Sequence, residues 1–216
     1  MKDPVRPPLP NIILIGLMGC GKTTIGKELH RETNLRFTDT DQLIEQQAGM
    51  SIPQIFKTHG ESPFRDLETG VLRQMQSGSR HRRIISTGGG ITIRPENRKL
   101  LKELGFVVWL HTDVNTLYQR ISRCSNRPLL QAPDPRGVLA RLMDERLPFY
   151  QETAHLTIDT ATFTRSLSAS LNPPGCSVHA DTVAYSFSVS FPQGLSLLLQ
   201  ETTKGDPHRR NAFRES

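Results

Sequence analysis

The sequence predicts an α/β fold in which a parallel β-sheet is covered by helices on both faces. Two observations lead to this prediction. Short apolar runs alternate with helical stretches from residue 11 to residue 171, as they do in chains that build parallel sheets. In addition, residues 16–23, GLMGCGKT, fit the phosphate-loop pattern G-x-x-x-x-G-K-[ST]. This segment lies between an apolar run and a helical run, which is the context in which such a loop holds a phosphate.

The elements follow from apolar spacing and from end signals. The expected strands are residues 11–15, 36–38, 84–87, 106–110 and 156–158. The expected helices are residues 23–32, 41–48, 51–56, 60–76, 95–104, 113–123, 137–150 and 162–171. Ser51 and Asp113 are helix caps, Pro95 occupies a first turn, and Gly105 follows a helix end. Pro148 is expected to strain the end of its helix.

Three parts of the chain differ in composition. Residues 1–10 are rich in proline and are expected to be a disordered leader, and residues 11–171 form the α/β domain. The segment NPPG at residues 172–175 ends the pattern, so residues 172–216 are a C-terminal extension to which we assign no role. Within it, apolar side chains alternate with small ones from Val183 to Phe191. This alternation fits an edge strand docked on the domain or on a partner as well as it fits a poorly ordered segment.

Charge limits the classes of function. The chain has 216 residues and a net charge of +6, and because the extension is neutral the surplus lies before it. Phosphate or carboxylate ligands explain such a surplus, with a nucleic-acid surface as the competing explanation. No basic helix studded with aromatic residues is present in the sequence, so we expect no nucleic-acid partner. No apolar run approaches the length of about 18 residues that a membrane span requires, so no membrane contact is expected.

The three cysteines, Cys20, Cys124 and Cys176, are far apart and show no CxxC spacing. A disulfide framework or a zinc site is therefore not expected, whereas a reducing, cytoplasmic location is. Cys20 lies within the phosphate loop, where a small residue that fills a tight turn is favoured over a redox-sensitive thiol.

The phosphate loop predicts a nucleoside triphosphate ligand. Gly19 and Gly21 let backbone N–H groups turn toward a polyphosphate, and the following helix adds the positive end of its dipole. Lys22 can reach the β- and γ-phosphates, and the hydroxyl of Thr23 can coordinate Mg²⁺.

Two further clusters follow strand ends, and the carboxyl ends of parallel strands meet at one edge of a sheet. The first cluster is residues 39–41, DTD. Asp39 would help to hold hydrated Mg²⁺, while Asp41 would take the proton of a substrate hydroxyl. The alternative is that Asp41 only caps the helix that follows it. The second cluster is the triple glycine at residues 88–90, where the backbone can approach a ligand closely and offer N–H donors.

Three arginines complete the set of candidate residues. Arg65 precedes Glu68 by one helical turn, so it either forms a surface ion pair or, held by Glu68, clamps a substrate carboxylate. Arg127 lies in a polar loop, where it is either solvated or part of a lid that neutralises the transferring phosphate. Arg146 is either a charge on a helix surface or a second clamp for a carboxylate.

Together these segments resemble one family. GLMGCGKTTIG, TDTDQLIE, FRDLE, STGGG, NRPLL and ERLPFY occur in the order and at the spacing of the shikimate kinases, and the resemblance spans residues 11–171. It implies the nucleoside-monophosphate-kinase-like P-loop fold, with three layers, a five-stranded parallel sheet and a mobile lid at about residues 124–135. It also implies an ATP-dependent kinase that phosphorylates the 3-hydroxyl of shikimate, giving shikimate 3-phosphate and ADP for chorismate and aromatic amino-acid biosynthesis.

The resemblance implies a role for each matching residue. The expected catalytic residues are Lys22, Asp41 and Arg127. Shikimate would be bound by Asp41, Arg65, Gly88, Gly89, Gly90 and Arg146. ATP would be bound by Gly19, Cys20, Gly21, Lys22, Thr23, Thr24, Arg120 and Arg127, with Arg120 packed on the adenine. Mg²⁺ would be held by Thr23 and, through water, by Asp39.

Two features depart from the family pattern. No basic residue follows the last expected strand, at residues 159–162, so the adenine is gripped more weakly or by other groups. The extension has no counterpart in the usual compact enzyme, for which a monomer is expected.

Two other functions were weighed. One is a kinase of another small hydroxy acid such as gluconate, against which the set of Asp41, Arg65 and three glycines argues. The other is a non-catalytic nucleotide-binding module whose extension recruits a partner, against which the intact Lys22, Asp41 and Arg127 argue.

Overall fold

The structure is a computed structural model that describes residues 11–78, 82–122 and 132–161. Its strands are β1 (Asn11–Ile15), β2 (Arg36–Asp39), β3 (Arg83–Ser86), β4 (Gly105–His111) and β5 (Leu156–Asp159). They form one parallel sheet in the order β2-β3-β1-β4-β5. The predicted strands agree with these to within a residue at either end. The α/β class with a five-stranded parallel sheet is confirmed.

The helices of the described part alternate with these strands. They are α1 (Lys22–Thr33), α2 (Thr40–Ala48), α3 (Ile52–His59), α4 (Glu61–Ser77), α5 (Pro95–Leu104), α6 (Val114–Ile121) and α7 (Pro135–Thr153). The predicted caps hold: the Asp113 carboxylate accepts a hydrogen bond from the main chain of α6, and Ser51 forms a capping box with Gln54 at the start of α3.

Helix α7 is longer than predicted at both ends. It begins at Pro135 because the Asp134 carboxylate accepts a main-chain hydrogen bond from the first turn, where a proline ring is tolerated. It continues past Pro148 to Thr153, and the side chains of Tyr150 and Thr153 are fully buried. A proline removes one main-chain hydrogen bond from a helix, and the burial of the residues beyond it outweighs that loss.

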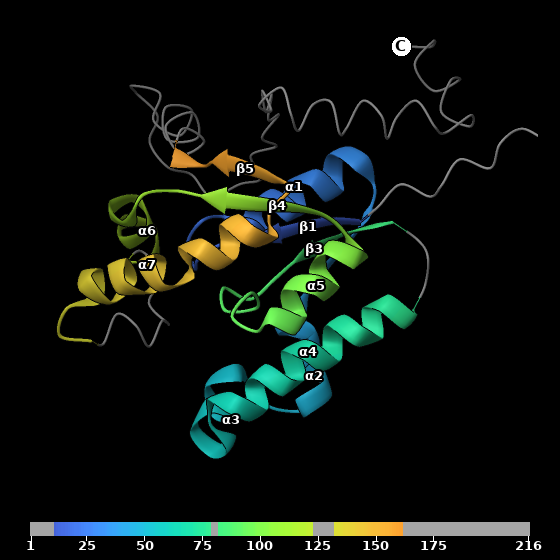
Figure 1. The fold of residues 1–216 in the computed structure, drawn as a ribbon, viewed down its shortest axis with the longest axis horizontal. Helices are drawn as coiled ribbons and strands as arrows, with labels where there is room; N and C mark the ends of the chain where they lie inside the picture. The colour runs from blue at the N-terminus through green and yellow to red at the C-terminus, as the bar shows by residue number, and fades with distance from the viewer. Residues whose placement is uncertain (1–10, 79–81, 123–131, 162–216) are drawn as a thin grey trace, which may run out of the picture. The chain divides into compact units, whose positions relative to one another are not determined.

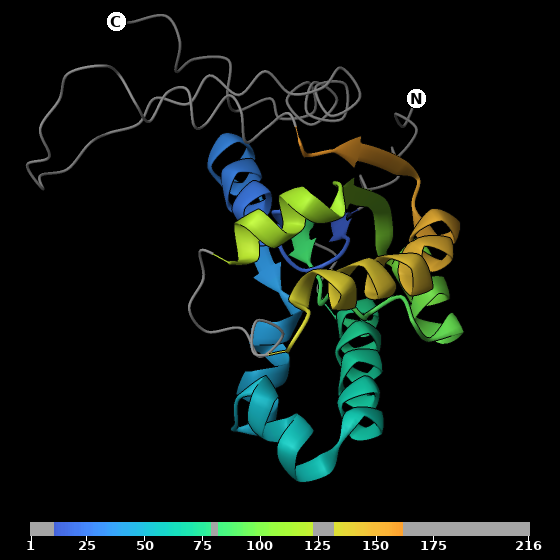
Figure 2. The same cartoon turned by 90° about the vertical axis from the view of Figure 1, so that its left-hand side faces the viewer.

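Helices cover both faces of the sheet (Figures 1 and 2). Ile13 and Ile15 of β1 pack in a core cluster with side chains of α4, α5 and α7. Leu14 points to the opposite face, toward α1, where a Cβ at Gly26 would meet it at 3.4 Å. The central strand is therefore buried on both sides, which is typical of parallel sheets and explains its continuous apolar sequence.

Helices α2, α3 and the start of α4 form an arm that extends away from the sheet (Figure 1). Ile44 of α2, Ile55 of α3 and Phe64 of α4 are buried and belong to the main core cluster. This packing fixes the first turn of α2, which carries Asp41, and the first two turns of α4, which carry Arg65.

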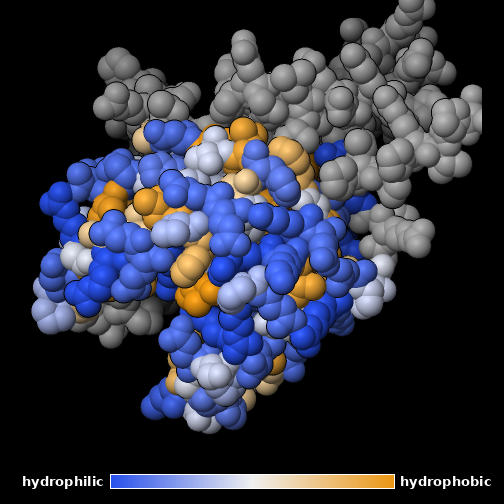
Figure 3. All heavy atoms as spheres, viewed as in Figure 1, coloured by the Kyte–Doolittle hydropathy of each residue, from blue (hydrophilic) through white to orange (hydrophobic). Residues whose placement is uncertain are grey.

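The face of the molecule in Figure 3 is mainly hydrophilic. Among the described residues, Phe56 is the large hydrophobic side chain that is exposed. None of the helices in the described part is both long and apolar enough to cross a membrane. The first structural unit ends at Ala161.

Several predictions fall on residues outside the described part. These are the leader, most of the expected lid together with Arg127, the helix at 162–171 and the extension at 172–216. They stay predictions.

Candidate active site

The phosphate loop joins β1 to α1 at the carboxyl end of β1. Gly16, Gly19 and Gly21 adopt φ angles of 139°, 84° and 98°, a region that other residues rarely occupy. A Cβ at Gly16 would lie 2.5 Å from the carbonyl oxygen of Leu110, and one at Gly19 would lie 2.8 Å from Ile121. Backbone angle and close packing against β4 and α6 both require glycine at these two positions.

Lys22 is held by the loop itself. Its side chain is buried, and the ammonium donates hydrogen bonds to the carbonyl oxygens of Gly16 and Leu17, at 2.7 and 3.0 Å. The sulfur of Cys20 lies 3.6 Å from the same nitrogen, and Cys20 is buried. Cys20 therefore fills the interior of the loop, as the sequence predicts for a small residue there.

Thr23 and Asp39 bring oxygen atoms to the edge of the loop. The Thr23 hydroxyl donates to Oδ2 of Asp39 across 3.3 Å, and Thr24 lies beside it on the exposed surface of α1. The other carboxylate oxygen of Asp39 accepts a hydrogen bond from the N–H of Asp41 at 3.0 Å. Asp39 thus caps α2, and the alternative in which Asp41 is the cap is wrong.

Asp41 is left free of capping and turns toward the triple glycine. Its Oδ1 is buried and has no hydrogen-bond partner among the described residues. Burial raises the pKa of this carboxyl to about 6, and repulsion from Asp39 adds to the rise while the Lys22 ammonium opposes it. A Cβ at Gly88 would lie 2.6 Å from Oδ1, so only glycine leaves room for the carboxylate there.

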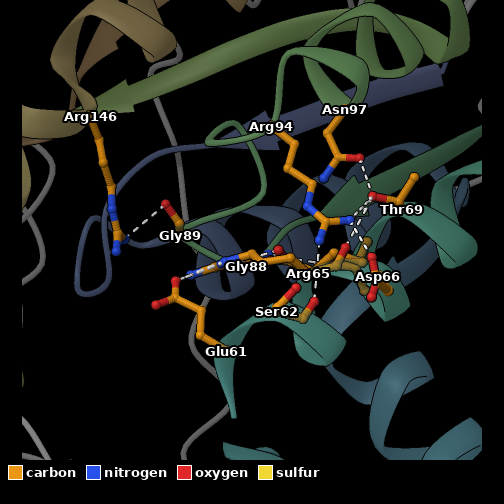
Figure 4. Close-up of polar contacts among 12 residues, drawn as sticks. Glu61, Ser62, Arg65, Asp66, Thr69, Gly88, Gly89, Arg94, Asn97 and Arg146 are labelled. Carbon is orange, nitrogen blue, oxygen red and sulfur yellow. Dashed lines mark hydrogen bonds and ion pairs between the residues drawn. The ribbon is translucent and has the colours of Figure 1, made fainter.

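Arg65 lies on α4 within a set of carboxylates (Figure 4). It is buried, and it donates to Oε2 of Glu68 at 2.7 Å and to Glu61 at 2.8 Å. The second oxygen of Glu68 is buried without a partner among the described residues. A Cβ at Gly90 would collide with the Arg65 guanidinium. The ion pair with Glu68 is therefore buried and does not match the surface pair weighed as the alternative.

Gly89 contributes its carbonyl oxygen, which accepts hydrogen bonds from Arg146 at 3.2 Å and from the hydroxyl of Tyr150 at 2.5 Å. Both donors lie one turn apart on α7. The N–H of Gly88 donates to the hydroxyl of Thr40 at 3.2 Å. The three glycines thus differ in role. Gly88 leaves room for carboxylates, the carbonyl of Gly89 accepts hydrogen bonds from α7, and Gly90 leaves room for the Arg65 guanidinium.

A polar network behind Arg65 was not predicted from the sequence (Figure 4). Arg94 donates to Asp66 at 2.6 Å, and the buried hydroxyl of Thr69 donates to Oδ1 of Asn97 at 2.8 Å or to the carbonyl of Arg65 at 3.0 Å. These contacts tie the segment after the triple glycine to α4. No short motif signals the contacts of Arg94 with Asp66 and of Thr69 with Asn97, because the partners in each lie 28 positions apart in the chain.

Arg120 of α6 lies on the other side of the phosphate loop. Its guanidinium donates to the carbonyl oxygen of Gly19 at 3.4 Å and to that of Thr160 at 2.6 Å. Apart from Arg127, which is not described, the structure thus gathers the predicted residues around the phosphate loop. Asp41, Arg65, the triple glycine and Arg146 form one side, and Arg120 lies on the other.

Comparisons with known proteins show the family of the chain. The sequence model of the shikimate kinase family matches residues 18–171. The shikimate kinase of Novosphingobium aromaticivorans is 46% identical over 149 residues, which cover 68% of this chain and 77% of that protein. The shikimate kinase of Thioalkalivibrio sulfidiphilus is 47% identical over 152 residues, covering 69% of this chain and 78% of that one.

Solved structures give the same result. Shikimate kinase from Acinetobacter baumannii in complex with shikimate superimposes with a TM-score of 0.67 at 42% identity, covering 76% of this chain and 93% of that one. Shikimate kinase from Aquifex aeolicus superimposes with a TM-score of 0.60 at 32% identity, covering 74% and 95%. The chain belongs to the shikimate kinase family.

Proposed function

We propose that this protein transfers the γ-phosphate of ATP to the 3-hydroxyl of shikimate, giving shikimate 3-phosphate and ADP on the route to aromatic amino acids. We further propose that it works in the cytoplasm as a monomer, on these two substrates, without nucleic acid or membrane. Residues 11–171 carry the activity, and the extension is an appendage. The relatives named above are the general support for the reaction.

The observation that carries the proposal is the buried Oδ1 of Asp41, which has no partner within the described part of the chain and lies between the phosphate loop and the arginines. A buried acceptor without a partner is costly to the fold, so a ligand that donates a hydrogen bond to it is favoured. A pKa of about 6 leaves the carboxyl ionised at neutral pH and basic enough to accept a proton. Asp41 is thereby suited to orient and deprotonate the attacking hydroxyl.

Arg65 and Arg146 suit the carboxylate of the acceptor. Arg65 is positioned by Glu68 and Glu61, and Arg146 is positioned by the carbonyl of Gly89. Guanidinium groups fixed in this way bind a carboxylate with little further loss of side-chain freedom. They would also fix the ring, so that its hydroxyl faces Asp41.

Lys22 would bridge the nucleotide and the acceptor. Its ammonium now donates to two loop carbonyls, and either of these can be exchanged for a phosphate oxygen without moving the side chain far. Cys20, Gly19 and Gly21 would present backbone N–H groups, and Thr24 would extend the same helix start. Arg127 would add a second positive charge when the transferring phosphoryl group is in place.

Thr23 and Asp39 fit Mg²⁺, since a hydroxyl and a carboxylate 3.3 Å apart are hard oxygen ligands of the kind that this ion takes together with phosphates and water. When bound, the ion supplies charge neutralisation between the β- and γ-phosphates. Asp39 would serve it through water by its Oδ2, the oxygen that does not cap α2.

The test is ADP release by the purified full-length chain with Mg²⁺, ATP and a panel of hydroxy acids that includes shikimate, quinate and gluconate. We expect turnover with shikimate and much less with the others. Turnover with gluconate but not shikimate would refute the proposal. No ADP release with any of the acids would favour a non-catalytic nucleotide-binding module. The same assay on residues 1–171 should give nearly the full rate.

A further inference from the structure

Thr160 lies where β5 ends, between β4 and the phosphate loop, and it is 1% exposed. It stands 140 positions after Cys20 in the chain, yet the order β1-β4-β5 in the sheet brings the two together. A buried hydroxyl in such a place must be hydrogen-bonded to be tolerated.

The contacts of Thr160 link three elements. Its hydroxyl oxygen lies 3.1 Å from the carbonyl oxygen of Cys20 and 3.2 Å from that of His111, so the hydroxyl proton is donated to one of them. The main-chain N–H of Thr160 donates to His111 at 2.8 Å. The end of β5 is therefore tied to β4 through the main chain, and the Thr160 hydroxyl lies within hydrogen-bonding distance of both the phosphate loop and β4.

The same residue holds Arg120. One nitrogen of the guanidinium donates to the Thr160 hydroxyl at 3.1 Å, and the other donates to the Thr160 carbonyl at 2.6 Å. A longer contact of 3.4 Å reaches the carbonyl of Gly19. Hydrogen bonds to a guanidinium lie in its plane, so these bonds use the edge of Arg120 and none of its flat faces.

We infer that Thr160 is a positioning residue for nucleotide binding, which acts by fixing the guanidinium plane of Arg120 beside the phosphate loop for stacking on a purine. The inference rests on the proposed function in one respect, namely that Arg120 meets the adenine of ATP. It also explains how residues 159–161, which hold no basic side chain, act on the adenine side of the site.

The test is Thr160→Val, which keeps the branched shape and the main-chain bonds but removes the hydroxyl. Calorimetry should show the Kd for ADP rising about tenfold, the usual effect of losing one hydrogen bond to a charged group. The KM for shikimate should stay within twofold of the unaltered protein. Thr160→Ser, which keeps the hydroxyl, should bind ADP as the unaltered protein does. If the valine variant does not fold, Thr160→Ala takes its place with the same expectation.

A double-mutant cycle with Arg120→Ala separates positioning from general stability. If Thr160 acts through Arg120, Thr160→Val should change ADP affinity less than twofold once Arg120 is alanine. Three results would each overturn the inference. They are fold-changes in the Kd for ADP that multiply when the two substitutions are combined, a Kd for ADP that Thr160→Val leaves unchanged, and equal losses of affinity for ADP and for shikimate in Thr160→Val. ADP binding requires no acceptor, so this result is independent of whether shikimate is the substrate.

Discussion

The nucleotide side and the acceptor side of the candidate site are built from different kinds of atoms. On the nucleotide side, backbone carbonyls hold Lys22, and the Thr160 main chain and hydroxyl hold Arg120. On the acceptor side, side chains from α2, α4 and α7 meet around the triple glycine, and two carboxylate oxygens, on Asp41 and Glu68, are buried without partners in the described residues.

This difference indicates where stability is given up for function. On the nucleotide side, Lys22 and Arg120 already donate hydrogen bonds to oxygen atoms of the protein without a ligand, so that side is stable by itself. The two carboxylate oxygens of the acceptor side that lack partners among the described residues cost free energy in the folded protein, and a hydroxylated ligand recovers part of it on binding. Substitutions on the acceptor side should therefore separate activity from stability, which the following predictions exploit.

The largest effect is expected for Asp41→Asn. The amide cannot accept the hydroxyl proton, so kcat should fall about a thousandfold, within the range that general bases supply. ADP affinity should stay within twofold, because the nucleotide side is untouched. Steady-state kinetics and calorimetry measure both. A kcat within tenfold of the unaltered protein would remove Asp41 from this role.

Arg65→Lys should be the next largest. Lysine cannot hold Glu68 and Glu61 and a substrate carboxylate in one plane, so kcat/KM for shikimate should fall about a hundredfold. Arg73→Lys is the matched control, because Arg73 lies on the same helix in an exposed pair with Glu96. Equal losses in the two variants would show that the burial of Arg65 has no functional consequence.

A pair of glycine substitutions tests the fit of Arg65. Gly90→Ala places a Cβ against the guanidinium, so it should lower kcat/KM for shikimate about tenfold by displacing Arg65. Gly70→Ala on α4 meets open space and should leave activity unchanged while raising stability by about 0.5 to 1 kcal/mol. Kinetics and urea unfolding distinguish them. Full activity in Gly90→Ala would mean that Arg65 tolerates another position.

The pH dependence of kcat/KM reports the same carboxyl. Because burial raises the pKa of Asp41 to about 6, the active, ionised form is lost as pH falls below that value. The rate constant should drop about tenfold for each unit below pH 6 and level off above it. A profile that stays flat down to pH 4.5 would contradict a raised pKa at the base.

How much of this site follows from the sequence depends on how far apart its partners lie. The phosphate loop is one short segment, Asp41 follows a strand end that a local apolar run predicts, and Arg65 precedes Glu68 by one helical turn. Lys22, Asp41 and Arg65 could therefore all be named in advance. Tyr150 could not be, although it ends the ERLPFY segment, because its partner Gly89 lies 61 positions away. Thr160 was passed over for a similar reason, since a threonine carries no spacing signal until the sheet places it beside Cys20. The different roles of Gly88, Gly89 and Gly90 could not be predicted either, because they depend on contacts with side chains of α2, α4 and α7.

The smallest effect is the change that Asp41→Asn makes in the free energy of unfolding. It is also the most direct test of whether activity and stability oppose each other at this site. The carboxyl has a pKa of 3.8 in the unfolded chain and about 6 in the fold, so the fold binds the proton more tightly. Stability therefore falls as pH rises from about 4 to 6, and at pH 7.5 the ionised group costs up to about 3 kcal/mol.

Asparagine carries no charge, so the Asp41→Asn variant should gain about 1 to 2 kcal/mol in its free energy of unfolding by urea at pH 7.5 and little at pH 4. Asp144→Asn, at an exposed position on α7, should change stability at neither pH. If the inactive Asp41→Asn were no more stable than the unaltered protein at pH 7.5, the buried oxygen would not be a stored cost, and the contrast between the two sides of the site would lose its energetic basis.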